Sequence, residues 1–177
     1  TQIITGDGTA AVVTFKAAKL KEGQRLYTNK GCASMGYDLP ALLGALYAKC
    51  PLEKLLITGD GSIMMNLQEL SSLRPFAKED IKIFILNNKG YHSIRQSQNN
   101  YFGGYEVGCG EDSNLYMPNF KKIAKAFDFK YLKVDSNKAL QKAISNKEKC
   151  IKFIEVMLDG GQGFEPRVTS KELPNGK

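Results

Sequence analysis

The sequence of 177 residues contains no tryptophan, a single histidine and four cysteines. The cysteines, Cys32, Cys50, Cys109 and Cys150, form no CxxC pair, so together with one histidine they do not predict a zinc site. Reduced thiols in a cytoplasmic protein are the simpler interpretation. No apolar run approaches the roughly 18 residues that a membrane-spanning helix needs. The first residues also lack the basic and then apolar order of a secretory signal, so the sequence gives no sign of membrane insertion or export.

Acidic residues are in the minority, with 18 against 25 basic residues and a net charge of +7. The lysines are spread along predicted helix faces and are not gathered with aromatic side chains, so nucleic-acid binding is not indicated. A solvated lysine surface and a polyanionic ligand account for the sign of the charge. The length and the 42% hydrophobic content are those of one soluble domain with its own core.

The middle of the chain predicts a strand, a helix and a second strand. The apolar run 55–58 has the character of a buried parallel strand, and Gly59-Asp60-Gly61 ends it. Over residues 62–73 apolar side chains recur every three or four positions, which predicts one helix. Residues 81–86 form a second buried apolar run. The unit is therefore a βαβ crossover, which is right-handed in nearly all proteins.

The turns that follow these two strands carry polar groups that can act together. Because parallel strands end at the same edge of a sheet, Asp60 and Asn87 are expected to lie close together. A carboxylate, an amide oxygen and a free backbone carbonyl, here that of Lys89, are the hard oxygen ligands that Mg²⁺ prefers. Gly61 and Ser62 open the helix, and its first N–H groups favour a phosphate. These parts together predict a site for a metal-bridged diphosphate.

At this point the sequence resembles a known family. The GDGS turn, the apolar helix and strand, and the NN pair are similar to the cofactor motif of thiamine diphosphate (ThDP) enzymes, and MNLQEL and RQSQ resemble their acetolactate synthase branch. The resemblance extends from about Ile3 to Val156. It implies ThDP and Mg²⁺ as cofactors and a lyase or transferase activity that decarboxylates a 2-keto acid, with or without joining the product to a second carbonyl. Ser97 departs from the family, because acetolactate synthases commonly have a tryptophan there that shapes the acceptor pocket.

The resemblance implies further contacts with the cofactor. In the family, the loop after the first strand touches the diphosphate, which points to Gly8 and Thr9. Ala33-Ser34-Met35-Gly36 resembles the turn whose first carbonyl accepts a hydrogen bond from the aminopyrimidine and whose methionine props the bent cofactor; core filling is the alternative role for such a methionine. The predicted cofactor-binding residues are therefore Gly8, Thr9, Ala33, Ser34, Met35, Gly59, Asp60, Gly61, Ser62, Asn87, Lys89, Gly90 and Tyr91, with Asp60, Asn87 and the Lys89 carbonyl on the metal.

His92 is the one candidate for a catalytic side chain. It follows Gly90 by two positions and lies in a segment, 91–116, that resembles the loop and helix that close over the active site in the family. An intrinsic pKa near neutrality suits a general acid. The alternative, which the sequence favours, is a loop histidine held by local hydrogen bonds.

The expected fold class is α/β, with a doubly wound, largely parallel six-stranded sheet flanked by helices, the ThDP-binding fold. Strands are predicted at about 2–5, 26–28, 55–58, 81–86, 130–134 and 151–157, and helices at 12–21, from Pro40, at 62–73, at 120–127 and after an N-cap at 135–137. Residues 1–158 are expected to form the diphosphate- and Mg-binding domain. Residues 159–177, rich in glycine, proline and charge, are predicted to be a tail or linker.

The resemblance also implies that the chain is incomplete as a catalyst. In the family, a glutamate that activates the aminopyrimidine comes from a pyrimidine-binding domain of the same or another subunit, and nothing in this sequence corresponds to it. The chain is therefore predicted to be half of the active site of a 2-keto acid decarboxylase or carboligase within a homo-oligomer, and to be inactive when isolated. The alternatives are the small subunit of a split ThDP decarboxylase and a non-catalytic diphosphate-binding module.

Overall fold

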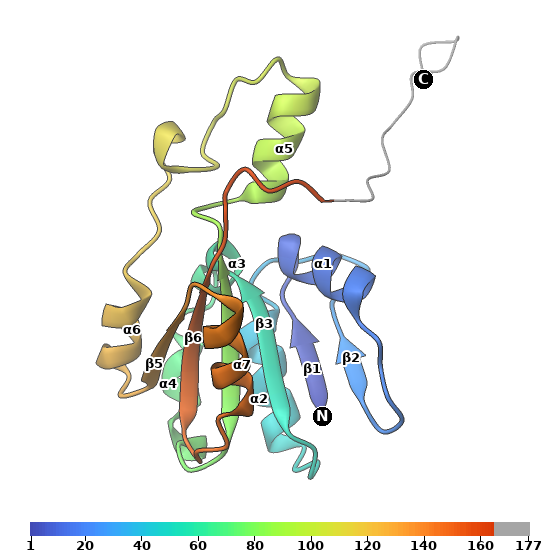
Figure 1. Cartoon of the computed structure of the whole chain (residues 1–177), viewed down its shortest axis with the longest axis vertical. Coiled ribbons are helices and arrows are strands. Elements are labelled where there is room, and N and C mark those ends of the chain that lie inside the picture. Colours follow the sequence, from blue (N-terminus) through green and yellow to red (C-terminus); the bar gives the residue numbers. More distant parts are fainter. Residues whose placement is uncertain (165–177) are drawn as a thin grey trace.

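The computed structural model describes residues 1–164, which form one parallel sheet with helices on both faces (Figure 1). The six strands lie in the order β2-β1-β3-β4-β6-β5, and every neighbouring pair is parallel. The predicted α/β fold class is thereby confirmed. The strands are β1 Gln2–Thr5, β2 Arg25–Tyr27, β3 Lys54–Gly59, β4 Ile81–Asn87, β5 Lys130–Val134 and β6 Ile151–Met157.

Helices cover both faces of this sheet, as parallel strands require. The chain places α1 and α7 on one face, and α2, α3, α4 and α6 on the other, while α5 stands above the carboxyl edge of the sheet (Figure 1). The helices are α1 Thr9–Ala17, α2 Asp38–Tyr47, α3 Asp60–Met64, α4 Glu69–Ser72, α5 His92–Tyr101, α6 Phe120–Ala126 and α7 Asn137–Ser145, with short 3₁₀ turns at Arg74–Phe76 and Glu111–Ser113.

The larger hydrophobic core lies on the face covered by α2, α3, α4 and α6. Leucines of α2 pack there against Ile83 and Ile85 of β4 and against Phe120 of α6. A smaller cluster under α7 contains Phe84 and Ile154. Because β4 is buried on both faces, its apolar residues are continuous along the strand, and this continuity made the strand predictable from the sequence.

Two helix predictions need correction. One helix over 62–73 is wrong, because the chain forms α3 and α4 with turns between them. Asn66 lies between the two helices, and its Nδ2 donates a hydrogen bond to the Gly36 carbonyl at 2.8 Å. The helix predicted at 12–21 instead begins at Thr9, directly after Gly8, and ends at Ala17. The predicted N-cap of α7 is confirmed, since the Ser136 hydroxyl accepts a hydrogen bond from the Ala139 N–H.

The end of the described chain crosses the carboxyl edge of the sheet beneath α5 (Figure 1). The carbonyl of Gly160 accepts a hydrogen bond from Arg95 of α5 at 3.3 Å. Most of the segment predicted as a tail, residues 165–177, lies outside the described residues, so the boundary at 158 stays a prediction. No helix within residues 1–164 combines the length and the apolar character needed to span a membrane. All four cysteines carry free thiols.

Candidate functional site

A cavity of about 230 Å³ opens at the carboxyl edge of the sheet, where β1, β3 and β4 end. Its walls come from four stretches far apart in the sequence: the loop after β1, the loop before α2, the turn from β3 into α3, and the chain between β4 and α5. The predicted residues that line it are Gly8, Thr9, Ala33, Met35, Gly59, Asp60, Gly61, Ser62, Gly90, Tyr91 and His92. The structure therefore brings most of the predicted site residues together around one cavity.

Asp60 is the buried carboxylate of this cavity, with 1% of its surface exposed. Its Oδ1 accepts a hydrogen bond from the Gly61 N–H at 2.8 Å and its Oδ2 accepts one from the Gly90 N–H at 3.0 Å. Burial raises the pKa of Asp60 to about 6, although the surrounding backbone N–H groups, Gly90 first, act to lower it. The carboxylate thus joins the turn after β3 to the turn after β4, as the crossover geometry predicts.

Asn87 and Asn88 point in different directions. Asn87 does not line the cavity: its Oδ1 accepts from the Lys89 N–H at 3.1 Å and its Nδ2 donates to Glu155 at 2.5 Å. Asn88 lines the cavity together with Asp60, and its Oδ1 is buried without a hydrogen-bond partner in the described part of the chain. A buried amide oxygen of this kind calls for a ligand. The sequence analysis singled out Asn87 from its spacing to Asp60 and missed Asn88; the orphaned oxygen is the signal that distinguishes them.

Ser34 and Lys89 also lie outside the lining of the cavity. The Lys89 carbonyl accepts a hydrogen bond from Arg95 at 3.2 Å. Lys89 has a positive φ of 63°, so the chain reverses sharply between Asn88 and Gly90. This reversal brings the Gly90 N–H to Asp60 and the Asn88 side chain into the cavity.

Two glycines permit close approaches that form the cavity wall. A Cβ on Gly61 would lie 2.3 Å from the Tyr91 ring, so only glycine lets this ring pack against the start of α3. Gly36 has a φ of +85°, and a Cβ there would lie 2.6 Å from Cβ of Met65. The Gly36 N–H donates to Ser62 Oγ at 3.0 Å, which ties the loop carrying Met35 to α3.

His92 is 5% exposed, and neither ring nitrogen has a hydrogen-bond partner among residues 1–164. Its ring meets Phe164 edge to face, with centroids 5.1 Å apart. The described contacts therefore do not support the alternative that local hydrogen bonds hold His92. A buried imidazole without partners at a cavity is available to a ligand.

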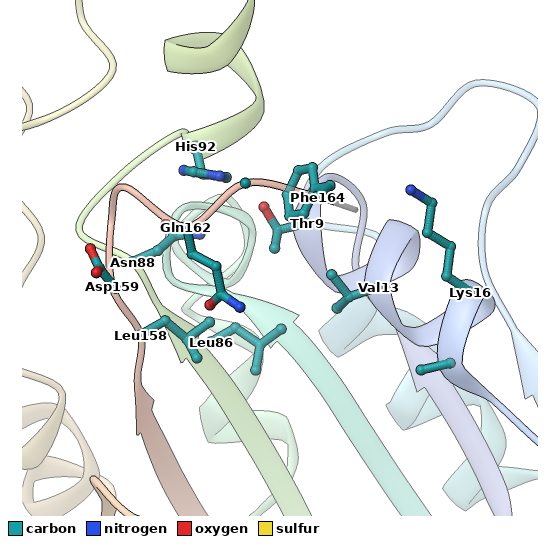
Figure 2. Close-up of a pocket in the computed structure, with 12 residues that line it drawn as sticks. Thr9, Val13, Lys16, Leu86, Asn88, His92, Leu158, Asp159, Gln162 and Phe164 are labelled. Atoms are coloured by element: carbon teal, nitrogen blue, oxygen red, sulfur yellow. The ribbon is translucent and has the colours of Figure 1, made fainter. Parts of the chain in front are cut away.

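A second cavity, of about 690 Å³, adjoins the first and shares Thr9, Asn88 and His92 with it. Figure 2 shows His92 and Phe164 on one side of it and Leu86 and Leu158 on the other. Further wall residues are Val13, Lys16 and Ala17 of α1 and Asp159, Gln162 and Gly163. The sequence analysis missed this cavity, because nothing in a glycine-rich segment predicts that residues 158–164 fold back beside α1.

The fold and the site together define a class. A buried carboxylate and a buried amide oxygen stand at the carboxyl edge of a doubly wound parallel sheet, beside the backbone N–H groups that open α3, and this arrangement fits a cation-bridged anionic cofactor. The family model described as "Thiamine pyrophosphate enzyme, C-terminal TPP binding domain" matches residues 6–156. The chain belongs to this family, and thiamine diphosphate is its cofactor. The resemblance drawn from GDGS and NN is thereby confirmed.

Large subunits of acetolactate synthases are similar to almost the whole chain. The isozyme 1 large subunit of Escherichia coli (strain K12) is 30% identical over 171 residues, which cover 94% of this chain and 29% of that protein. The large subunit of Buchnera aphidicola subsp. Schizaphis graminum is 29% identical over 172 residues, with the same coverage of 94% and 29%. That of Cyanidium caldarium is 34% identical over 128 residues, covering 71% and 21%. The chain spans less than a third of each of these relatives.

Proposed function

We propose that the chain forms the diphosphate- and Mg²⁺-binding half of the active site of an acetolactate synthase-like enzyme that acts on 2-keto acids. The observation that carries this proposal is the pair formed by Asp60 and Asn88, a buried carboxylate and an unpartnered buried amide oxygen lining one cavity. Hard oxygen ligands of this kind suit Mg²⁺, which keeps its remaining positions for water and phosphate oxygens.

In this proposal Asn88 supplies the amide ligand, and Asn87 supports the turn. Asn87 lies outside the lining of the cavity, where its Nδ2 donates to Glu155 and its Oδ1 accepts from the Lys89 N–H. The Lys89 carbonyl remains the predicted third ligand, and it would exchange its present hydrogen bond from Arg95 for the cation. Asp60 contributes the negative charge that the dication requires.

The other cavity residues fit the remaining parts of the cofactor. Gly8, Thr9 and Ser62 line the cavity in which a diphosphate would lie, and Met35 supplies an apolar support. Bound ThDP supplies the nucleophilic carbon and the electron sink for breaking the bond between the carbonyl and carboxylate carbons of a 2-keto acid. The chain's own contribution is to bind and orient the cofactor, and its burial of Asp60 and His92 keeps water from these groups.

We assign His92 as the proton donor of this half-site. The imidazole is buried at the junction of the two cavities with both ring nitrogens unpartnered in the described residues, so it can hold or release a proton toward a bound molecule. The glutamate that activates the aminopyrimidine is proposed to come from a pyrimidine-binding domain of the same or another subunit. Whether the complete enzyme ends as a decarboxylase or a carboligase depends on that partner.

A non-catalytic module that holds a nucleotide is the rival function, and competition binding separates the two. ThDP is titrated into the chain in Mg²⁺, first without and then with an equal concentration of ADP, with thiamine monophosphate as the control that lacks the second phosphate. The proposal predicts that ADP leaves the ThDP affinity unchanged within twofold and that thiamine monophosphate binds at least tenfold more weakly. Displacement of ThDP by equimolar ADP would support the nucleotide module.

A further inference from the structure

Glu155 is a buried carboxylate in the middle of the molecule that the cofactor site does not use directly. It lies on β6, in register with Ile85 of β4, and 8% of its surface is exposed. Its Oε1 accepts a hydrogen bond from Asn87 Nδ2 at 2.5 Å, and its Oε2 accepts one from the Tyr131 hydroxyl. No ion pair joins it to a basic side chain within residues 1–164. A buried carboxylate with only neutral donors is costly to fold, so its position calls for an explanation.

The contacts of Asn87 supply that explanation. A carboxylate can only accept, so Glu155 fixes the Asn87 amide with Nδ2 toward β6 and Oδ1 toward the following turn. That Oδ1 accepts the Lys89 N–H at 3.1 Å, and the main-chain carbonyl of Asn87 accepts the Leu158 N–H at 2.9 Å. Three hydrogen bonds, two from β6 and the residue directly after it and one from the following turn, therefore hold Asn87 at the end of β4.

The turn held in this way carries the groups that face the cofactor cavity. Directly after Asn87, the Asn88 Oδ1 is buried at the cavity, Lys89 adopts its left-handed conformation, and the Gly90 N–H donates to Asp60 at 3.0 Å. A left-handed conformation is strained for lysine and persists only where the surroundings fix it. The Asn87 side chain is the local contact that fixes it, and Glu155 orients that side chain.

We infer that Glu155 is a positioning residue: through Asn87 it holds the 87–90 turn in the shape that presents Asn88 and Gly90 to Mg²⁺ and to Asp60. The expected effect on cofactor binding rests on the proposed function. The effect on the turn itself can be measured without any ligand. Tyr131 provides the matched control. It donates to the other oxygen of Glu155, lies on the edge strand β5, and makes no hydrogen bond to residues 87–90 in the described part of the chain.

The first readout is amide hydrogen exchange in the 177-residue chain without ligand. Glu155→Met removes both contacts, and we expect exchange of the Lys89 and Gly90 amides to accelerate at least tenfold relative to amides in the middle of β4. Tyr131→Phe should leave these two amides within twofold of wild type. Glu155→Gln, whose side-chain oxygen can still accept from Asn87, should restore their protection. If Glu155→Met does not fold, Asn87→Ala replaces it, because it removes the same hydrogen bond from the other partner. It should accelerate exchange of the same two amides.

The second readout is the dissociation constant of ThDP in Mg²⁺. Glu155→Met and Asn87→Ala should each weaken binding about tenfold, and the double variant should lose no more than either single variant, because both remove one interaction. Equal protection of Gly90 in Glu155→Met and wild type would overturn the inference, as would a Tyr131→Phe effect of the same size. If wild type binds no ThDP while the exchange pattern holds, the proposed function fails and the positioning role stands.

Discussion

Ala33 adopts a backbone conformation that favours glycine, with a φ of +49°. It is the first residue of the Ala33-Ser34-Met35-Gly36 turn, and a left-handed conformation costs an alanine roughly 1 kcal/mol. The exposed side chain is a methyl group, so it can form no hydrogen bond that would offset this cost. The turn nevertheless keeps the shape that brings Met35 to the cavity.

Ala33→Gly is therefore expected to stabilise the chain by about 0.5 kcal/mol, since the relief of strain exceeds the extra entropy of the unfolded glycine. Urea unfolding measures the difference. Ala18→Gly is the matched control, because Ala18 has an ordinary φ of −66° and the same change there should destabilise. A loss of stability in Ala33→Gly would contradict the strain.

Asp60 makes cofactor binding dependent on pH. Burial raises its pKa to about 6 in the metal-free chain, and a metal binds only the carboxylate form. We expect the affinity for ThDP in Mg²⁺ to fall about tenfold between pH 7 and pH 5. Calorimetric titration measures it, with the affinity of Mg²⁺ for free ThDP determined at each pH as the control. An affinity that stays flat over this range would contradict the assignment.

The same group affects folding with a definite sign. Because the folded-state pKa of Asp60 lies above its ordinary value of 3.8, proton uptake favours the folded metal-free chain. That contribution is fully present below pH 3.8 and is lost as the pH rises through about 6. Bound Mg²⁺ replaces the proton, so the ligand-bound chain does not show this loss.

How far the sequence predicted the site differs from residue to residue. Asp60 was predictable because glycines flank a lone carboxylate directly after an apolar strand. The choice between Asn87 and Asn88 was not, because adjacent residues at a strand end point to opposite sides, and only the partners of each side chain tell them apart. The partner that fixes the Asn87 side chain, Glu155, comes from β6, 68 positions further along the chain.

The strands β4 and β6 carry a buried cluster of charged side chains at their amino ends, opposite the edge at which the cofactor cavity lies. Lys82 and Lys152 are adjacent in register, and their side chains are 1% and 0% exposed. Both ammonium groups contact Asp80 Oδ1, at 2.9 Å and 2.6 Å. Burial tends to raise the pKa of Asp80, but the two lysines hold it below its ordinary value. The Asp80 carboxylate therefore stabilises the fold above pH 3.8, and this contribution is lost as the pH falls below that value.

Asp80→Asn should destabilise the chain by about 3 kcal/mol, because buried Lys152 loses its carboxylate partner and buried Lys82 keeps only Glu53. The urea midpoint at pH 7 measures the loss. Glu148→Gln serves as the control, since it removes the charge of the exposed ion pair with Lys130 and should cost little. Equal effects of the two substitutions would show that the buried cluster contributes nothing beyond an exposed pair.

The strands were easier to predict than the helices. The buried strands β3, β4 and β6 are short and mostly apolar, so their positions follow from composition. The apolar spacing over 62–73 is helical, yet the chain breaks there because Asn66 bonds to Gly36, thirty positions earlier in the chain. The apolar periodicity predicts which face of the segment is buried. It does not predict that a polar side chain such as Asn66 hydrogen-bonds to a distant loop.

The described molecule is proposed to hold one half of an active site. The cofactor cavity lies at the open carboxyl edge of the sheet, and the exposed aromatic residues Tyr101, Phe102 and Tyr105 lie on and after α5 above it. The relatives are more than three times as long as the matched region, so a pyrimidine-binding partner is proposed and the activity of the complete protein remains a proposal.

The isolated chain should therefore turn over no 2-keto acid, even when it is saturated with ThDP and Mg²⁺. Carbon dioxide release from pyruvate and from longer 2-keto acids measures this directly. Adding a pyrimidine-binding domain from an acetolactate synthase tests whether the missing half restores turnover. Full activity of the chain without a partner would refute the half-site.

The most direct test of the metal-bridged diphosphate site is calorimetric titration of ThDP into the chain, in Mg²⁺ and then in EDTA. Wild type, Asp60→Ala, Asn88→Ala and His92→Ala are compared, each checked for an unchanged fold by its unfolding curve. We predict binding heat in Mg²⁺ that disappears in EDTA, in Asp60→Ala and in Asn88→Ala, and that persists in His92→Ala. Binding that is indifferent to EDTA and to both ligand substitutions would contradict the account.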